Sequence, residues 1–209
     1  MEQKSFSLMK SLKYFSFLLF GLSLPALAEE VPETGPLFDG DEEVVYFFSY
    51  HCAQCFDAHS YLSMWSSMQE KDIRRVPLLG ENGEWEFGAR LFFLLSYAKD
   101  KFPLSEFERE KAAYQIVLNM DEYPESSSEY MSLLRDYGLE FESTEFLAWW
   151  RNSELMLAST EEIISTENLS QVTPPTLRVY ANEKVSWISY PSLSIEPGFE
   201  MLKILNSEL

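Results

Sequence analysis

The segment that most constrains the fold runs from a strand signal into a pair of cysteines. Residues 44–48, VVYFF, form a continuous run of β-branched and aromatic side chains, which is typical of a strand buried on both faces of a sheet. The sequence Cys-Ala-Gln-Cys follows at residues 52–55 and contains the only two cysteines among 209 residues. Apolar residues then recur at helical spacing over 58–68. The pattern predicts a strand, a Cys-x-x-Cys turn and a helix.

The segments around this motif predict an α/β fold interrupted by helices. Residues 73–79 are interpreted as a second strand, which would complete a parallel β-α-β unit. A strand hairpin and a last helix are expected at 176–180, 185–189 and 197–206. Four helical patterns lie between these strands, at 84–99, 105–120, 126–137 and 143–166. In the last of them, Trp149 and Trp150 are interpreted as bordering a hydrophobic groove, with at least one of the two in the core.

The expected domain organisation has five parts. A signal peptide is followed by an N-terminal arm, and the α/β domain is then split in two by an inserted helical domain. The expected boundaries are 1–28 for the signal peptide, 29–43 for the arm, 44–79 and 151–209 for the two parts of the α/β domain, and 80–150 for the insertion.

The first 28 residues have the features of a secretory signal. Lysines precede a short apolar stretch, and Pro-Ala-Leu-Ala at 25–28 predicts cleavage after Ala28. Because the apolar stretch is shorter than the about 20 residues that cross a bilayer, an uncleaved anchor is the less favoured alternative. We therefore expect export into an oxidising compartment, with no stable membrane insertion after cleavage.

Charge and cysteine count exclude two classes of protein. The chain has 34 acidic and 16 basic residues and a formal net charge of −18, so nucleic acid is not an expected partner. The acidic residues are mostly scattered, which is typical of a solvated surface. Two cysteines are too few for a small scaffold held by many disulfides. The pair is therefore interpreted as a reactive site.

Cys52 is predicted to be the nucleophile of this site. At the start of a helix its sulfur should lie near free backbone amides and the positive end of the helix dipole, and both favour the thiolate and lower the pKa of the thiol. Cys55, one turn further along, is expected to be buried and to act as the resolving thiol. A substrate thiolate would attack oxidised Cys52, and the substrate's second thiolate would release the mixed disulfide.

The two histidines of the chain, His51 and His59, flank the cysteines. His51 is interpreted as tuning Cys52 electrostatically, with a ring that merely packs as the alternative, and Gln54 as a neutral hydrogen-bond donor to the same sulfur. The two histidines and two cysteines could also supply four zinc ligands. Adjacent residues at a strand end rarely both point inward, however, so we expect neither a metal nor a cofactor.

The order of these features, from Phe47 through Cys55 to the Pro-Thr pair before the last hairpin, resembles the DsbA family of bacterial periplasmic thiol-disulfide oxidoreductases. The resemblance implies a thioredoxin-like fold with an inserted helical domain. It implies oxidation of unfolded or newly secreted cysteine-containing proteins, and reoxidation by a DsbB-like, quinone-linked membrane oxidase. It also implies that Pro175 is the cis-proline facing the redox-active disulfide, and that Pro174 and Thr176 belong to the same substrate-binding segment.

Three features depart from the family pattern. Pro174 precedes the expected cis-proline and has no N–H to donate to a bound peptide. Ala53 and Gln54 stand between the cysteines, where the best-known members have Pro and His, and the loss of the histidine implies a milder oxidant. Tyr46 stands at the strand position where many members keep a buried acid, so proton transfer around Cys55 would need water or another group.

Functions of two classes fit this sequence. The favoured one is a periplasmic dithiol oxidase with Cys52 and Cys55 as catalytic residues, and a reductase of the same fold differs from it only in redox poise and partner. The alternative is a redox-inactive peptide-binding or chaperone-like module whose single disulfide is structural. The reduction potential of the pair and the asymmetry of the two thiols distinguish these functions.

Overall fold

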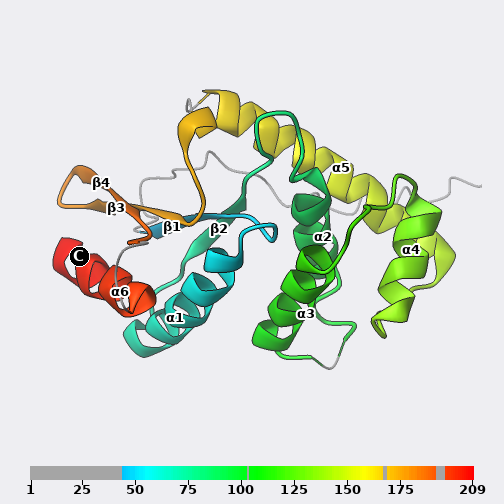
Figure 1. The fold of residues 1–209 in the computed structure, drawn as a ribbon, viewed down its shortest axis with the longest axis horizontal. Coiled ribbons are helices and arrows are strands. Elements are labelled where there is room, and N and C mark those ends of the chain that lie inside the picture. The colour runs from blue at the N-terminus through cyan, green and yellow to red at the C-terminus, as the bar shows by residue number, and fades with distance from the viewer. Residues whose placement is uncertain (1–43, 103, 167–168, 192–195) are drawn as a thin grey trace, which may run out of the picture. The chain divides into compact units, whose positions relative to one another are not determined.

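The computed structural model shows four strands, six α-helices and a short 3-10 helix, η1 (Leu169–Gln171), in the described part of the chain (Figure 1). The described residues are 44–102, 104–166, 169–191 and 196–209. The predicted signal peptide and N-terminal arm lie outside them. In these ranges no helix is both long enough and apolar enough to span a membrane.

The strands form one mixed sheet in the order β2-β1-β3-β4. They are β1 (Val44–Phe48), β2 (Arg74–Pro77), β3 (Thr176–Ala181) and β4 (Lys184–Ser189). β1 pairs in parallel with β2 and antiparallel with β3, and β3 and β4 form an antiparallel hairpin. The predicted β-α-β unit and hairpin are thus confirmed, and β1 lies beside a strand that follows it by more than 120 residues.

The central strand β1 is buried on both faces, as its sequence predicts. Val44, Tyr46 and Phe48 face the larger apolar core, to which the helices contribute most of the side chains. Val45 and Phe47 face a smaller cluster on the other side, against which the end of α5 packs. The alternation follows from the period of two residues in an extended strand. Burial on both faces accounts for a run with no polar residue.

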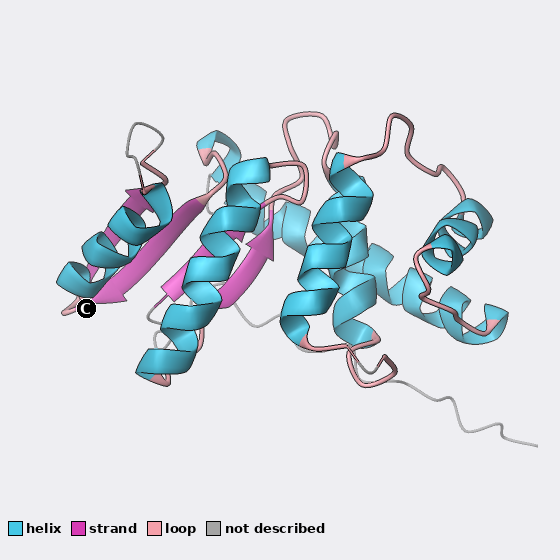
Figure 2. Cartoon of the chain, turned by 60° about the horizontal axis from the view of Figure 1, so that its bottom comes forward, coloured by secondary structure: helices cyan, strands magenta, loops and turns pink. Residues whose placement is uncertain are grey.

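Two helices cover one face of the sheet, α1 (Ala53–Gln69) and α6 (Pro197–Glu208) (Figure 2). They pack closely because α6 carries a glycine at the contact. A Cβ at Gly198 would lie 2.0 Å from the ring of Tyr61, a distance that no side chain can occupy. The glycine therefore sets how near the last helix comes to the helix that begins at the cysteines.

The segment between β2 and β3 is helical, as predicted. Its helices are α2 (Glu86–Tyr97), α3 (Glu106–Leu118), α4 (Ser127–Asp136) and α5 (Ser143–Thr166). Capping boxes join Ser105 to Glu108 and Ser126 to Glu129, so both predicted helix starts are confirmed. Gly138, with φ of 78°, follows α4 and takes the left-handed conformation that a glycine tolerates.

The inserted helices and the sheet share one core. Phe48 at the end of β1 contacts Phe92 of α2, with ring centroids 5.2 Å apart, and Tyr50 contacts Tyr114 of α3 at 4.7 Å. α5 continues without a break across residue 150, which is the expected end of the insertion. The division into two domains therefore stays a prediction, because the described helices and strands belong to one compact unit.

Candidate active site

The backbone places Cys52 at the junction of β1 and α1. The chain turns after β1 through a hydrogen bond from the Cys52 N–H to the Ser49 carbonyl, 3.1 Å, and α1 begins with a bond from the Cys55 N–H to the Cys52 carbonyl, 3.0 Å. Cys52 is the residue before the first helical residue, and its side chain does not cap the helix. The sulfur therefore lies where the first amides of a helix have no partner within the helix.

The two thiols have opposite environments. Cys52 is half-buried and Cys55 is fully buried. Hydrogen bonding from the Cys55 thiol, with the backbone N–H groups of Cys55 and Gln54, holds the pKa of Cys52 below its usual value, although burial acts against them. Burial raises the pKa of Cys55 far above its usual value, and the neighbouring Cys52 raises it further. Cys52 is thus the thiol that ionises, and Cys55 keeps its proton.

A segment from the far end of the chain faces Cys52. The Cys52 Sγ lies 3.7 Å from the carbonyl oxygen of Pro174, and the peptide bond between Pro174 and Pro175 is cis. Pro175 is buried, and its carbonyl accepts a hydrogen bond from the Tyr190 N–H at 3.2 Å. The Thr176 hydroxyl donates to the Thr173 carbonyl at 2.6 Å. The structure thus brings Pro174 to Cys52, and Pro175 and Thr176 follow it in the chain.

His51 points toward the inserted helices. Its Nδ1 lies 3.3 Å from the Ser49 hydroxyl, and its ring contacts Tyr123 edge to face at 5.1 Å. The ring also lies against Gly88 of α2, where a Cβ would come within 3.1 Å of it. Burial lowers the pKa of His51, which favours the neutral ring. Tuning of Cys52 by His51 stays a prediction, because the groups that lower the Cys52 pKa belong to Cys55 and Gln54.

Gln54 acts on Cys52 through its backbone. Its N–H is one of the groups that favour the Cys52 thiolate, whereas its side chain is exposed. The predicted hydrogen bond from the Gln54 amide side chain stays a prediction. Any residue other than proline supplies the same N–H, so the identity of Gln54 matters less at this contact than its place in the first turn of the helix.

A buried polar cluster lies behind the cysteines, and sequence reasoning missed it. Its centre is Glu110 of α3, whose side chain is 7% exposed and lies 2.8 Å from the Arg75 guanidinium. The Tyr50 hydroxyl donates to the same carboxylate at 2.7 Å. The Tyr46 hydroxyl donates to the Cys55 carbonyl at 3.0 Å. The only signal in the sequence is that Glu110 falls on the apolar face of a predicted helix.

His59 lies at the edge of this cluster. It is buried, and burial, with Arg75 nearby, lowers its pKa to about 4. A cavity of about 280 Å³ lies beside it and is also lined by Tyr46, Arg75 and Glu106. Within the described ranges, no three His, Cys, Asp or Glu side chains are arranged to hold a metal ion.

Comparison with known proteins gives structural relatives only. No family model matches the chain, and no curated protein sequence matches it. The structure is similar to that of Pseudomonas aeruginosa DsbA, with a TM-score of 0.60 and 20% identity over 83% of this chain and 86% of that one. For the DsbA disulfide interchange protein of Klebsiella pneumoniae the TM-score is 0.54 and the identity 14%, over 83% and 92%. For the oxidoreductase NmDsbA1 of N. meningitidis the values are 0.50 and 18%, over 79% and 81%.

These similarities define the class of fold. The chain has a thioredoxin-like fold with a helical insertion, in the arrangement found in DsbA proteins. The predicted fold class and the resemblance to DsbA are thereby confirmed at the level of the fold. At identities of 20% or below, the activity has to be inferred from the site itself.

Proposed function

We propose that the protein is a thiol-disulfide oxidoreductase that donates a disulfide from Cys52 and Cys55 to newly secreted proteins. The observation that carries the proposal is the asymmetry of the two thiols. Cys52 is accessible and its pKa is lowered, whereas Cys55 is buried and its pKa is raised. A nucleophile and a resolving thiol need these properties, and a purely structural disulfide does not.

The reaction is a two-step exchange. A substrate thiolate attacks the Cys52 sulfur of the disulfide, and the Cys52–Cys55 bond breaks, so that Cys55 leaves and takes up a proton. The second thiolate of the substrate then attacks the substrate sulfur that is bonded to Cys52 in the mixed disulfide, and the Cys52 thiolate is expelled. The substrate loses two electrons and the Cys52–Cys55 pair gains them.

The lowered pKa of Cys52 favours oxidation of substrate thiols over reduction of substrate disulfides. A stabilised thiolate is a good leaving group in the second step, and it also stabilises the reduced protein, which makes the disulfide more oxidising. The stabilisation comes from the Cys55 thiol and from two backbone amides, without a charged histidine between the cysteines. We therefore expect an oxidant milder than one with an imidazolium at that position.

Pro174–Thr176 is the proposed substrate-binding segment. The Pro174 carbonyl lies beside the Cys52 sulfur, so a substrate held along this segment brings its own sulfur to Cys52. Neither proline has an N–H, and this part of the segment can therefore accept hydrogen bonds from a peptide but cannot donate them. Affinity for the peptide backbone is expected to be low, so side-chain contacts elsewhere must add to it.

The proposed site of action is the periplasm, since residues 1–28 have the features of a secretory signal. There a DsbB-like, quinone-linked membrane oxidase would restore the disulfide. A reoxidising partner is needed because the two electrons taken from each substrate must be passed on before the next cycle. The resemblance to DsbA suggests which kind of partner this is. The proposal includes no nucleic-acid partner, and no stable insertion of the protein in the membrane after the signal is cleaved.

The test is direct transfer of the disulfide. The oxidised protein is mixed with an equal amount of a reduced two-cysteine peptide, and the products are alkylated and weighed by mass spectrometry. We expect one peptide disulfide for each Cys52–Cys55 disulfide lost, and none with Cys52→Ser. A peptide that stays reduced with the unaltered protein would overturn the proposed function.

A further inference from the structure

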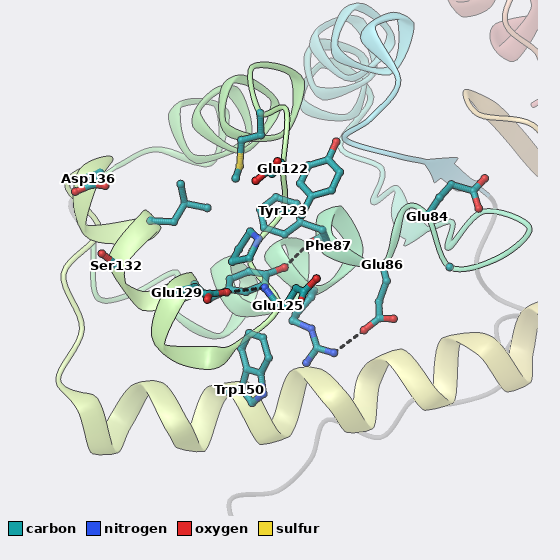
Figure 3. A pocket seen from close by; sticks show the side chains of 16 residues that line it. Glu84, Glu86, Phe87, Glu122, Tyr123, Glu125, Glu129, Ser132, Asp136 and Trp150 are labelled. Carbon is teal, nitrogen blue, oxygen red and sulfur yellow. Dashed lines mark hydrogen bonds and ion pairs between the residues drawn. The ribbon is translucent and has the colours of Figure 1, made fainter.

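A large groove in the inserted helices extends to Tyr123, whose ring contacts the residue before Cys52. It has a volume of about 1020 Å³ and is lined by α2, α4, α5 and the loops that precede α2 and α4 (Figure 3). Tyr123, in the loop before α4, links it to the cysteines, because its ring contacts His51 at 5.1 Å. His51 directly precedes Cys52 in the chain, so Tyr123 joins the groove to the residue next to the reactive cysteine.

The floor of the groove is a row of aromatic rings. Tyr123 stacks on Phe87 with centroids 4.7 Å apart, Phe87 contacts Tyr130 at 4.9 Å, and Tyr130 contacts Trp150 at 4.7 Å. The row leads from the residue before Cys52 to α5. Trp150 thus borders this groove while its neighbour Trp149 is buried. One member of the pair lies in the core, as the sequence predicts, but the groove is rich in carboxylates and is not the hydrophobic one expected.

Carboxylates surround these rings. Six of the described residues that line the groove are acidic, namely Glu84, Glu86, Glu122, Glu125, Glu129 and Asp136. Arg90 is the one cation among the described lining residues, and it forms an ion pair with Glu86 at 2.6 Å. The groove therefore carries a net negative charge next to aromatic faces, and both features attract cations.

Arg90 shows how this groove holds a guanidinium. Its side chain is 12% exposed, its charged group lies 4.2 Å above the Trp150 ring, and it bonds the Glu86 carboxylate. A guanidinium is suited to both contacts because it is planar and less strongly hydrated than an ammonium group. Tyr123, which is 38% exposed, offers a further ring near Glu122 and Glu125 (Figure 3), so the groove has the same types of group to offer a second arginine.

We propose that this groove binds a basic, arginine-containing segment of the polypeptide whose cysteine reacts at Cys52. The inference rests on the proposed function and names its preferred substrate class. An extended chain covers about 3.3 Å per residue, so basic residues within about five positions of the reacting cysteine can reach Tyr123. Binding there supplies affinity that the two prolines opposite Cys52 cannot supply through backbone hydrogen bonds.

The test compares two dithiol peptides that differ only in charge. In one peptide, an Arg-Arg pair lies four residues before the reactive cysteine and a second pair lies four residues after it. The other peptide has Glu-Glu at the same positions. We expect kcat/KM for disulfide transfer to be at least about tenfold higher for the basic peptide, with the ratio falling as salt is added. Equal values for the two peptides would overturn the proposed specificity and leave the oxidoreductase activity standing.

Charge-neutralising variants separate the groove from the overall charge of the protein. Glu122, Glu125 and Asp136 are exposed and lie outside the capping boxes, so the triple variant Glu122→Gln, Glu125→Gln, Asp136→Asn is expected to fold and to lose most of the preference. The control is the triple variant Glu70→Gln, Glu140→Gln, Glu162→Gln. It has the same net charge, neutralises exposed residues outside the groove, and should keep the preference. The same loss in both variants would overturn the assignment to the groove.

A binding measurement keeps this inference independent of the redox reaction. Cys52 and Cys55 are both replaced by serine, and the peptides carry serine in place of cysteine, so no disulfide can form. Calorimetric titration should show binding of the basic peptide and at least about tenfold weaker binding of the acidic one. If the basic peptide binds but the unaltered protein transfers no disulfide, the proposed function fails and the binding groove stands. If neither peptide binds, the groove proposal fails.

Discussion

Replacement of Glu110 by glutamine tests the buried cluster behind the cysteines. The Glu110 side chain is 7% exposed and takes part in two close contacts, from Arg75 at 2.8 Å and from Tyr50 at 2.7 Å. Removal of one partner from a buried ion pair costs about 3–5 kcal/mol. Glutamine keeps an acceptor for the Tyr50 hydroxyl, and Arg75 keeps its second ion pair, with Glu106 at 2.8 Å. We therefore expect Glu110→Gln to lower the free energy of unfolding by about 2–3 kcal/mol.

Urea unfolding of the oxidised protein measures this cost, and Glu106→Gln is the matched control. Glu106 pairs with the same guanidinium, but its side chain is 60% exposed, so its loss should cost less than about 1 kcal/mol. With a slope of about 2 kcal/mol per molar urea, the midpoint should fall by about 1–1.5 M for Glu110→Gln and by less than about 0.5 M for Glu106→Gln. Equal shifts for the two variants would refute the reasoning, because burial would then not set the strength of the pair.

Three further predictions concern the thiols, the pH dependence of stability and the helix contact. In the reduced protein, the rate at which Cys52 reacts with iodoacetamide should rise with pH and reach half its maximum below pH 9, the ordinary pKa of a thiol. Cys55 should react only after unfolding. Equal modification of both thiols would contradict the asymmetry. His59 has a folded pKa of about 4 against an ordinary value of 6.5. Its contribution to stability should therefore be complete above about pH 6.5 and fall as the pH drops toward 4, and unfolding curves of His59→Gln should lack this component. Gly198→Ala should destabilise the protein by about 1–3 kcal/mol, because the new Cβ would meet the Tyr61 ring; an unchanged thermal midpoint would show that the helices separate at little cost.

Local signals made most of the fold predictable. The run Val44–Phe48, the two capping boxes and Gly138 each determine a nearby backbone conformation through contacts within a few residues. The position of Cys52 at a helix start, and the burial of Cys55 one turn later, follow from the same kind of local geometry. These features lie where the sequence predicts them, because no distant segment competes with the local preference.

The remaining features depend on contacts between distant segments. Glu110 and Arg75 meet because α3 packs beside the sheet, and a single sequence gives no measure of that distance. The contact of Tyr123 with His51 joins a loop to the turn after β1 in the same way. The approach of Pro174 to Cys52 across 122 residues was expected only through the resemblance to DsbA. The continuity of α5 across residue 150 reflects a core shared by the helices and the sheet, which composition does not reveal.

The reduction potential of the Cys52–Cys55 pair is the most direct test of the central claim that this pair donates disulfides. The mature protein is equilibrated with graded glutathione buffers, and free thiols are trapped by alkylation at each potential. We predict a value between about −120 and −200 mV, because the Cys52 thiolate is stabilised and the pair should oxidise ordinary dithiols. A value below about −250 mV would contradict the claim, since such a pair would act as a reductase or as a structural disulfide.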